Sequence, residues 1–435
     1  MKILVISRWF APRNIIGAIR PTELCKYFAK NNDVTCVAEL YGEQGFSDRE
    51  LLPVKVERVK AGRVGLYSID HSTKATETRK ATQEIAHSQK KKSPLIVSAR
   101  RFAAQLMHII DEIEWTRKAI IKAIQVIEDI NPDCVVTSYG PESSVLVGLS
   151  IKKRYPELNW VSDMRDPMTH LQQSWWRKRI NGYWEKKMAK AADAITTISD
   201  SLGEKYKNTF NHKRVGVFVN GYDPEDKSVD LCKNDGILRI GYTGALYGGR
   251  RKMDVLFKAI KSLETHGAHI PLEVHYAGGD IAELYKQAES YDATDYIVNH
   301  GLLPRSEAQQ LQEMCDILCV LSWNTAEEKG VLTGKFPEYL RLKKTVLALV
   351  SGEIPEAELT QRINDMHCGY SFEYCSGEEG YSKFENWMKK MLDLKSKGEP
   401  LTSGMEVSLI EQYSYDNISF KYEQFLKDLQ DVKGQ

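Results

Sequence analysis

Residues 238–252 read Leu-Arg-Ile-Gly-Tyr-Thr-Gly-Ala-Leu-Tyr-Gly-Gly-Arg-Arg-Lys. The first five residues are mainly apolar and fit a buried strand, and a glycine-rich loop that ends in three cations follows directly. An amphipathic pattern over 253–265 then predicts a helix. Glycines such as Gly244 give a ligand access to the backbone, and Arg250 and Arg251 can each bind a phosphate through two parallel hydrogen bonds. The alternative is a solvated basic turn.

The same strand–loop–helix unit recurs along most of the chain. Predicted strands of the first half lie at 3–7, 34–40, 54–59, 134–138, 160–163, 194–198 and 215–219. Those of the second half lie at 238–242, 272–276, 296–299, 317–321 and 345–350, with helices at 253–265, 305–315 and 336–343. Apolar strands that alternate with helices indicate parallel sheets covered on both faces. The predicted fold class is therefore α/β, with two doubly wound Rossmann-like domains that face each other across a cleft.

A chain of 435 residues is long enough for two domains. We expect an N-terminal domain at 1–219 that carries a polar and basic insertion, mobile or helical, at about 61–104. The polar segment 220–236 contains Gly and Pro and is predicted to be the linker to a C-terminal domain at 237–405. A helical segment at 406–435 is expected to cross back to the N-terminal domain.

Composition excludes several classes of protein. The net charge of +1 provides no overall field for nucleic acid, and no apolar run is long enough to span a bilayer. None of the eight cysteines forms a Cys-x-x-Cys pair, so we expect reduced thiols, a cytoplasmic protein and no metal site. No cofactor is predicted.

Loops that follow strands are the candidate ligand sites, because open parallel sheets bind ligands beyond the carboxyl ends of their strands. The loop 8–20 follows the first strand and contains Gly17, which would let a ligand approach the backbone closely. The chain has neither Gly-x-Gly-x-x-Gly here nor a Walker lysine pattern, which argues against a dinucleotide dehydrogenase and a P-loop ATPase. The alternative is a plain connecting loop.

The segment 332–340 predicts the start of a helix, with Pro337 in its first turn. Free N–H groups near Thr333 and Gly334, together with Lys335, would then face an anion. Glu338 can accept hydrogen bonds from ribose hydroxyls. The alternative is a glutamate that only complements the helix dipole.

Charged residues also crowd the segment 162–170, which follows a strand of the first domain. Asp166 and His170 are candidates for an acceptor or catalytic surface. An internal Arg–Asp pair that only shapes the loop is an equally good interpretation.

In this order and spacing, these motifs resemble the family 4 glycosyltransferases of the GT-B fold, of the bacterial surface-polysaccharide type. The resemblance covers nearly the whole chain. Its motifs are Phe10-x-Pro12 with Gly17, Asp163-Met-Arg-Asp-Pro, Ala194-Ile-Thr-Thr-Ile-Ser, Asn220-Gly-Tyr-Asp, Tyr242-Thr-Gly-Ala, Thr333-Gly-Lys-Phe-Pro-Glu-Tyr-Leu and Lys344-Thr-Val-Leu.

The resemblance implies that the second domain binds a nucleotide-sugar donor, and that transfer retains the anomeric configuration without a metal. Arg250 or Arg251 and Lys335 would hold the diphosphate, and Glu338 would hold the ribose. The backbone at Gly301-Leu302 would meet the nucleobase.

One position departs from the family pattern, in which many members carry two glutamates eight residues apart. Eight residues before Glu338 is Gly330, and Glu327 and Glu328 are offset. Contacts to the sugar ring that the first glutamate makes in the family are therefore open in this chain.

The predicted function is transfer of a sugar from a nucleotide-diphosphate sugar to a glycan or lipid-linked acceptor in polysaccharide biosynthesis. Arg250, Arg251 and Lys335 would stabilise the charge that develops on the diphosphate leaving group. The alternatives are a catalytically silent nucleotide-sugar-binding partner of another transferase, a GT-B nucleotide-sugar epimerase, or a phosphorylase.

Two stretches combine aromatic residues with cations, at 74–102 and at 175–187. Such stretches suit the headgroup region of an anionic membrane, so we expect peripheral contact at the inner face of the membrane. The alternative is a solvated charged surface, with Trp184 in the core.

Overall fold

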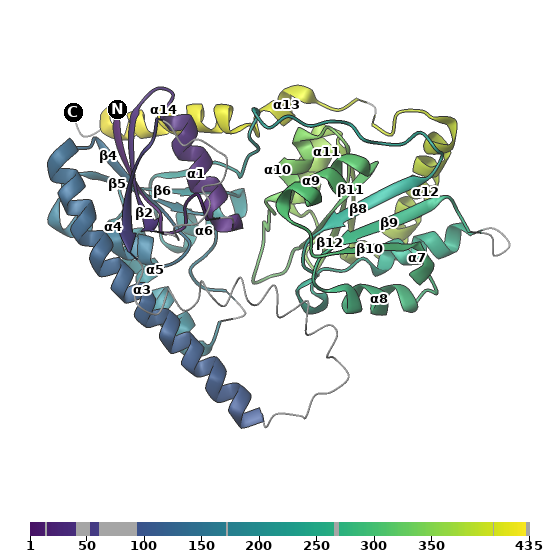
Figure 1. Ribbon diagram of the computed structural model, residues 1–435, viewed down its shortest axis with the longest axis horizontal. Helices are drawn as coiled ribbons and strands as arrows, with labels where there is room; N and C mark the ends of the chain where they lie inside the picture. The colour runs from purple at the N-terminus through teal and green to yellow at the C-terminus, as the bar shows by residue number, and fades with distance from the viewer. Residues whose placement is uncertain are drawn as a thin grey trace. The chain divides into compact units, whose positions relative to one another are not determined.

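The computed structural model describes residues 1–13, 15–40, 53–60, 94–170, 173–264, 269–402 and 404–431. These residues form two compact units (Figure 1). The first unit comprises Met1–Thr197, Lys205–Gly216 and Ser419–Gln435, and the second comprises Ile198–Glu204 and Val217–Ile418. The residues from 419 onward, which belong to the segment expected to cross back, are thus part of the first unit.

The first unit contains a seven-stranded sheet in the order β3-β2-β1-β4-β5-β6-β7. Its strands are β1 (Lys2–Ile6), β2 (Asp33–Leu40), β3 (Lys55–Lys60), β4 (Cys134–Ser138), β5 (Asn159–Met164), β6 (Ala194–Thr197) and β7 (Val215–Val217). Pairing is parallel from β3 through β6. Every residue of β4 and β5 is buried. This is what we expect of central strands in a sheet that is covered on both faces.

The helices between these strands are α1 (Ile16–Phe28), α3 (Pro94–Ile130), α4 (Ser143–Arg154), α5 (Trp175–Ala191) and α6 (Asp200–Thr209), and α14 (Tyr415–Asp431) joins them from the C-terminal end of the chain. The basic segment 61–104 is therefore helical from Pro94, and 61–93 lie outside the described residues. Helix α3 begins at Pro94, a residue type that is favoured in the first turn of a helix.

The C-terminal helix α14 contributes to the core of the first unit. The Tyr422 ring is fully buried and packs edge-to-face on Phe28 at 5.3 Å between ring centroids. Its hydroxyl lies 2.8 Å from Thr196 Oγ1, at the end of β6. The first sheet thus depends on residues from the far end of the sequence.

The second unit contains a six-stranded sheet in the order β10-β9-β8-β11-β12-β13. Its strands are β8 (Leu238–Thr243), β9 (Leu272–Ala277), β10 (Ile297–Gly301), β11 (Ile317–Trp323), β12 (Thr345–Ser351) and β13 (Gly369–Glu373), all parallel. Its helices are α7 (Asp254–Leu263), α8 (Ile281–Glu289), α9 (Arg305–Met314), α10 (Lys335–Arg341), α11 (Glu358–Met366), α12 (Gly377–Lys397) and α13 (Val407–Glu411).

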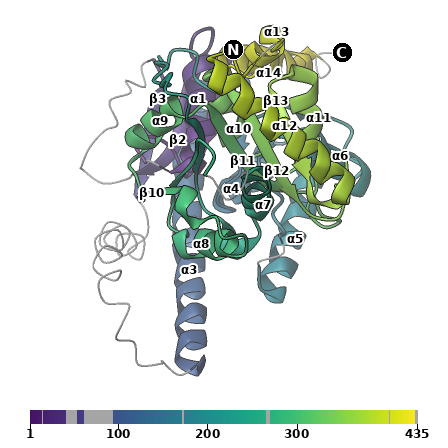
Figure 2. The same cartoon turned by 90° about the vertical axis from the view of Figure 1, so that its right-hand side faces the viewer.

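Both faces of this second sheet are covered. Helices α7, α8 and α12 pack on one face, with α7 beside α12, and α9, α10 and α11 pack on the other (Figure 2). Alternate residues of β11 point into the two cores: Ile317, Cys319 and Leu321 into one, Leu318 and Val320 into the other. The strand order follows the same pattern as in the first sheet. In each sheet the direction of the order reverses between two central strands, β1/β4 in the first and β8/β11 in the second.

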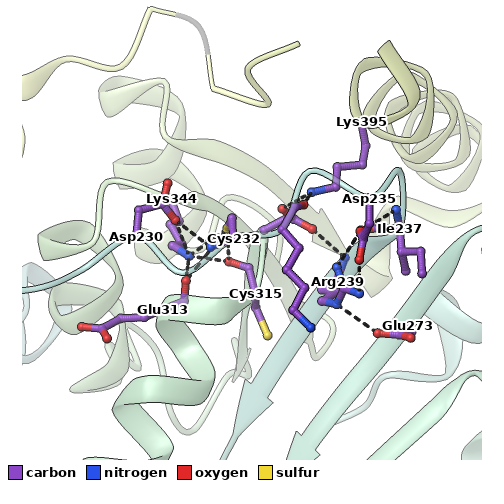
Figure 3. Close-up of polar contacts among 12 residues, drawn as sticks. Asp230, Cys232, Asp235, Ile237, Arg239, Glu273, Glu313, Cys315, Lys344 and Lys395 are labelled. Atoms are coloured by element: carbon purple, nitrogen blue, oxygen red, sulfur yellow. Dashed lines mark hydrogen bonds and ion pairs between the residues drawn. The ribbon is translucent and has the colours of Figure 1, made fainter. Parts of the chain in front are cut away.

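The segment 220–236, expected to be a linker, is bound to the second unit (Figure 3). Lys344 Nζ donates hydrogen bonds to Cys315 O at 2.7 Å and to Cys232 Sγ at 3.1 Å. Lys395 Nζ donates to Lys233 O at 2.6 Å. These contacts hold residues 230–233 against the sheet. All eight cysteines are free thiols, and burial raises the pKa of Cys232 to about 11.

No helix within the described ranges is long and apolar enough to cross a membrane.

Candidate functional site

The loop after β8 turns sharply, because three consecutive residues adopt left-handed backbone conformations. Tyr247, Gly248 and Gly249 have φ of 51°, 61° and 86°. Glycine adopts these values without strain, whereas Tyr247 does so at a cost. The Gly-Gly pair therefore serves the turn itself, in addition to any access that it gives a ligand.

Both ends of this loop are fixed by groups at the carboxyl ends of other strands. Asp280 Oδ2, which follows β9, accepts a hydrogen bond from the backbone N–H of Leu246 at 2.7 Å. Ser351 Oγ, at the end of β12, donates to the carbonyl of Arg250 at 2.8 Å. The loop is thus held at the β8/β11 reversal, where doubly wound sheets bind ligands.

Arg250 has a carboxylate partner at this edge. Its Nη2 lies 2.8 Å from Glu328 Oε2, which also accepts a hydrogen bond from Trp323 Nε1 at 2.8 Å. The guanidinium stacks over the Trp323 ring, 4.3 Å from its centroid. Arg250 would therefore have to share or leave Glu328 in order to bind a phosphate.

Arg251 has no such partner. It is buried and stacks on the Tyr247 ring at 4.6 Å. Its Nη1 lies 3.3 Å from Tyr242 Oη and 3.4 Å from Ala245 O, and its Nε makes no hydrogen bond. No carboxylate in the described part of the chain forms an ion pair with it. Arg251 is thus a buried cation with capacity for an anion.

Lys335 lies beside the same loop. Its Nζ donates a hydrogen bond to Thr243 Oγ1 at 3.1 Å, and Thr243 also accepts one from Gln312 Nε2 at 2.9 Å. Burial lowers the pKa of Lys335, and the positive charge of Arg251 adds to this effect. A Cβ at Gly244 would lie 2.9 Å from Lys335 Cε, so glycine leaves room for the ammonium.

Glu338 is half-buried on α10, the helix that follows β11. Its Oε1 lies 3.7 Å from Nη2 of Arg305, the first residue of α9 after β10. Gly301 (φ 66°) and the exposed Leu302 lie at the end of the same strand, β10. The structure therefore brings the ribose and nucleobase candidates to one side of the sheet edge.

The residues before α10 lie next to Lys335. Thr333 Oγ1 is buried without a hydrogen-bond partner, and Gly334 is exposed with open space where a Cβ would be. Helix α10 has only seven residues, so the charge of Lys335, rather than the helix dipole, is the feature that would attract an anion here.

Sequence reasoning missed several residues of this edge. Gly278 follows β9, and a Cβ there would lie 2.3 Å from the carbonyl oxygen of Gly244. The Gly278-Gly279 pair directly after an apolar strand was the available signal. Glu328 and Trp323 were missed as partners of Arg250, because their meeting depends on the pairing of β8 with β11.

The candidates of the first unit lie at the carboxyl ends of its central strands. Gly17 O accepts a hydrogen bond from Arg165 Nη1 at 2.7 Å. Asp166 and His170 are exposed, and Asp166 is 3.8 Å from Arg165 Nε. Arg165 and Asp166 are thus the internal Arg–Asp pair that the sequence suggested for this loop. Asp163 forms a second ion pair with a residue outside the loop, since its Oδ1 lies 2.8 Å from Arg20 Nη2.

Across the described ranges, no three or more His, Cys, Asp or Glu side chains are grouped so as to hold a metal ion.

No protein-family model and no curated protein sequence matches this chain. Several solved structures match it over nearly their whole length, including the following three. Sucrose-phosphate synthase from Thermosynechococcus elongatus has a TM-score of 0.65 and 12% identity over 99% of both chains. TarM has a TM-score of 0.57 and 9% identity over 98% of both chains. The lipopolysaccharide outer core galactosyltransferase WaaB, in its apo form, has a TM-score of 0.56 and 13% identity over 98% of this chain and 99% of its own.

The chain has the GT-B fold. At Gly330 the chain departs from the pattern of the family that its sequence resembles, and the structure gives the reason. Gly330 has φ of 64°, and a Cβ there would lie 2.5 Å from Ser201 Cβ and 2.9 Å from Glu358 Oε2. A glutamate cannot occupy the position without moving its neighbours. Glu328, two residues earlier, is bound to Arg250 and Trp323 instead.

Proposed function

We propose that this protein is a glycosyltransferase that moves a sugar from a nucleotide-diphosphate sugar to a glycan or lipid-linked acceptor in polysaccharide biosynthesis. The observation that carries the proposal is the pair formed by the buried Arg251 and the half-buried Lys335 at the β8/β11 reversal. Among the described residues, neither cation forms an ion pair with a carboxylate. A diphosphate supplies the negative charge that such a pair lacks. The fold shared with WaaB and sucrose-phosphate synthase supports the same class.

The mechanism that we propose is electrostatic. Negative charge grows on the diphosphate as the glycosidic bond breaks, and Arg251 and Lys335 stabilise it. Arg250 joins them when a phosphate competes with Glu328 for its guanidinium. In this proposal the cations take the role that a divalent metal has in other transferases, and the anomeric configuration is retained, as in the family that the sequence resembles.

The remaining residues position the substrates. Glu338 accepts hydrogen bonds from the ribose, and the backbone at Gly301 and Leu302 meets the nucleobase. Asp166 and His170 of the first unit are the candidates for handling the acceptor hydroxyl.

A panel of nucleoside diphosphates and their sugars, added in a thermal-unfolding experiment, tests the proposal. A ligand that binds only the folded state raises the Tm by mass action. Donor turnover is then measured with the best ligand, with and without a chelator, and we expect turnover to persist in the chelator. If no nucleotide raises the Tm, the proposal is wrong. If turnover stops in the chelator and returns with magnesium or manganese, the metal-independent mechanism is wrong.

One observation favours a second function, a catalytically silent partner that binds a nucleotide sugar. Glycine replaces the first glutamate of the family at Gly330, and Arg250 is bound to Glu328. The turnover assay separates the two functions, because a silent partner binds the donor and never consumes it. An epimerase would convert the donor with no acceptor present.

Replacing Glu338 by alanine is expected to weaken donor binding, since the ribose hydroxyls lose a charged acceptor. The expected loss is about 1.5–3 kcal/mol, or roughly 10- to 150-fold in Kd. Calorimetric titration measures it, with Glu307→Ala on the neighbouring helix α9 as the control, because Glu307 is an exposed carboxylate. Equal affinity of the Glu338 variant and the unaltered protein would remove Glu338 from the site.

Helix α5 is the surface that we propose for peripheral contact with an anionic membrane, at the cytoplasmic side. Trp175, Ile180 and Tyr183 are 73%, 47% and 53% exposed, and Lys187 lies 5.2 Å from the Tyr183 ring. Trp184 is half-buried and packs on Tyr183. Of the basic stretch 74–102, only the helical backbone from Pro94 lies within the described residues.

We expect the protein to sediment with anionic vesicles at low salt, and less so at moderate salt, because each cation near the surface contributes about 1 kcal/mol. Trp175→Ala should reduce the bound fraction. Protein that stays in the supernatant with anionic vesicles at low salt would point to a soluble acceptor.

A further inference from the structure

Among the described residues, Arg8, Arg13, Arg20 and Arg165 lie at the carboxyl edge of the first sheet, and the first three have a hydrogen-bonded carboxylate. The pairs are Arg8 with Glu39 at 3.0 Å, Arg13 with Glu39 at 2.7 Å, and Arg20 with Asp163 at 2.8 Å. Arg165, directly after β5, is the exception among these four. Its charge is therefore not neutralised in the way that the charges of its neighbours are.

The surroundings of Arg165 leave hydrogen-bonding capacity unused. Its side chain is 12% exposed, and its nearest carboxylate, Asp166, lies 3.8 Å from Nε and is itself 70% exposed. Nη1 donates to Gly17 O at 2.7 Å, but the buried Nε makes no hydrogen bond. Burial lowers the pKa of Arg165, because the nearby carboxylates do not compensate for lost hydration.

Two glycines make room for this guanidinium. A Cβ at Gly140 would lie 2.0 Å from Arg165 Nη2, and one at Gly17 would lie 2.7 Å from the same atom. Gly17 and Gly140 follow β1 and β4, the two strands that flank the reversal of strand order. The Trp9 ring lies 5.5 Å from Arg165 Cζ. The guanidinium is thus held in place at the ligand-binding edge of a doubly wound sheet.

We propose that Arg165 binds an oxyanion, a phosphate or a carboxylate, carried by the acceptor. An oxyanion supplies both the charge and the acceptor oxygen that the guanidinium lacks, whereas a neutral hydroxyl supplies only the oxygen. The oxyanion site follows from the contacts of Arg165, and its assignment to the acceptor rests on the proposed function. The acceptor is then an anionic saccharide, and Arg165 discriminates against neutral sugars.

The test is a calorimetric titration of the full chain, with saturating nucleoside diphosphate present to fill the donor site. The probes are glucose 6-phosphate, glucuronate and glucose. We expect the unaltered protein to bind one or both anionic probes at least about tenfold more tightly than glucose, and Arg165→Gln to lose that preference. The two anionic probes distinguish phosphate from carboxylate recognition.

Arg13→Gln is the matched control, because Arg13 stacks on the same Trp9 ring but is already paired with Glu39. It should retain the preference for anions within about twofold. Arg165→Lys keeps the positive charge but lacks the two-pronged hydrogen-bonding geometry of the guanidinium. It replaces Arg165→Gln as the test if that variant does not fold, and we expect it to bind the anionic probes about fivefold more weakly. An anion affinity unchanged in both Arg165 variants would overturn the proposal.

Failure of the proposed function has a different signature. If the chain turns over no nucleotide sugar, the titration is repeated without nucleotide, and the loss of anion binding in Arg165→Gln still identifies the site. If anion binding is lost in Lys335→Ala and kept in Arg165→Gln, the anion binds in the second unit and Arg165 has no ligand role.

Discussion

Lys335→Ala is expected to lower kcat by about 100- to 1,000-fold, the range found when one stabilising donor of a developing charge is removed. The Nζ of Lys335 is held 3.1 Å from Thr243 Oγ1, beside a glycine that leaves room for it, so the ammonium is fixed before the reaction begins. Because charge on the diphosphate grows toward the transition state, kcat should fall much more than donor affinity. Steady-state kinetics and a separate donor titration measure the two effects. Arg251→Ala should behave alike.

Lys329→Ala is the control, because Lys329 is an exposed lysine in the loop that precedes α10. Its kcat should stay within about twofold of the unaltered value. A Lys335 variant with a raised KM and an unchanged kcat would show that the lysine binds substrate and transition state equally, and the electrostatic mechanism would be wrong.

Glu112→Gln is expected to change how stability depends on pH. Glu112 forms an ion pair with Arg8, which Glu39 and Asp111 also contact, so two buried carboxylates and the half-buried Asp111 share one guanidinium. Burial raises the pKa of Glu112 from 4.5 to about 7, and the neighbouring charges of Asp111 and Glu142 add to the rise. Folding therefore favours protonated Glu112, and this contribution to stability is lost as pH rises toward 7.

The unaltered protein should lose about 2.5 kcal/mol relative to Glu112→Gln between pH 5 and pH 8, since glutamine does not ionise. Urea unfolding of both proteins at the two pH values measures the difference. Asp129→Asn on the same helix serves as the control, because Asp129 is an exposed carboxylate. A stability difference between Glu112→Gln and the unaltered protein that is the same at both pH values would place the pKa of Glu112 near its usual value.

The sequence predicted most strands within one or two residues, because strands buried on both faces are mainly apolar. It missed β13, whose residues Gly-Tyr-Ser-Phe-Glu carry polar groups at alternate positions, since this edge strand is half-exposed. The pairing of β13 depends on Gly369, where a Cβ would lie 1.8 Å from the carbonyl oxygen of Val346. A close backbone contact of this kind leaves no periodic signal in a sequence.

The sequence predicted that the loops after the strands would hold the candidate residues, because open parallel sheets bind ligands at that edge. That Arg250 or Arg251 would act together with Lys335 came from the resemblance to the family. The neutralisation of Arg250 by Glu328, 78 positions away, was not predictable, since it depends on side-chain geometry between β8 and β11. For the same reason, the position of Arg165 against Gly140 could not be read from motifs.

The contribution of α14 to the first unit bears on synthesis at the ribosome. The hydroxyl of Thr196 has its partner in the folded protein only after Tyr422, 226 positions later in the chain, has been synthesised. The residues of the second unit, which end at Ile418, emerge before that partner does. Although domains usually fold in the order in which they are made, here the first sheet to be translated is the last to have a complete core. During translation, its exposed apolar strands are therefore the segment that most needs a chaperone.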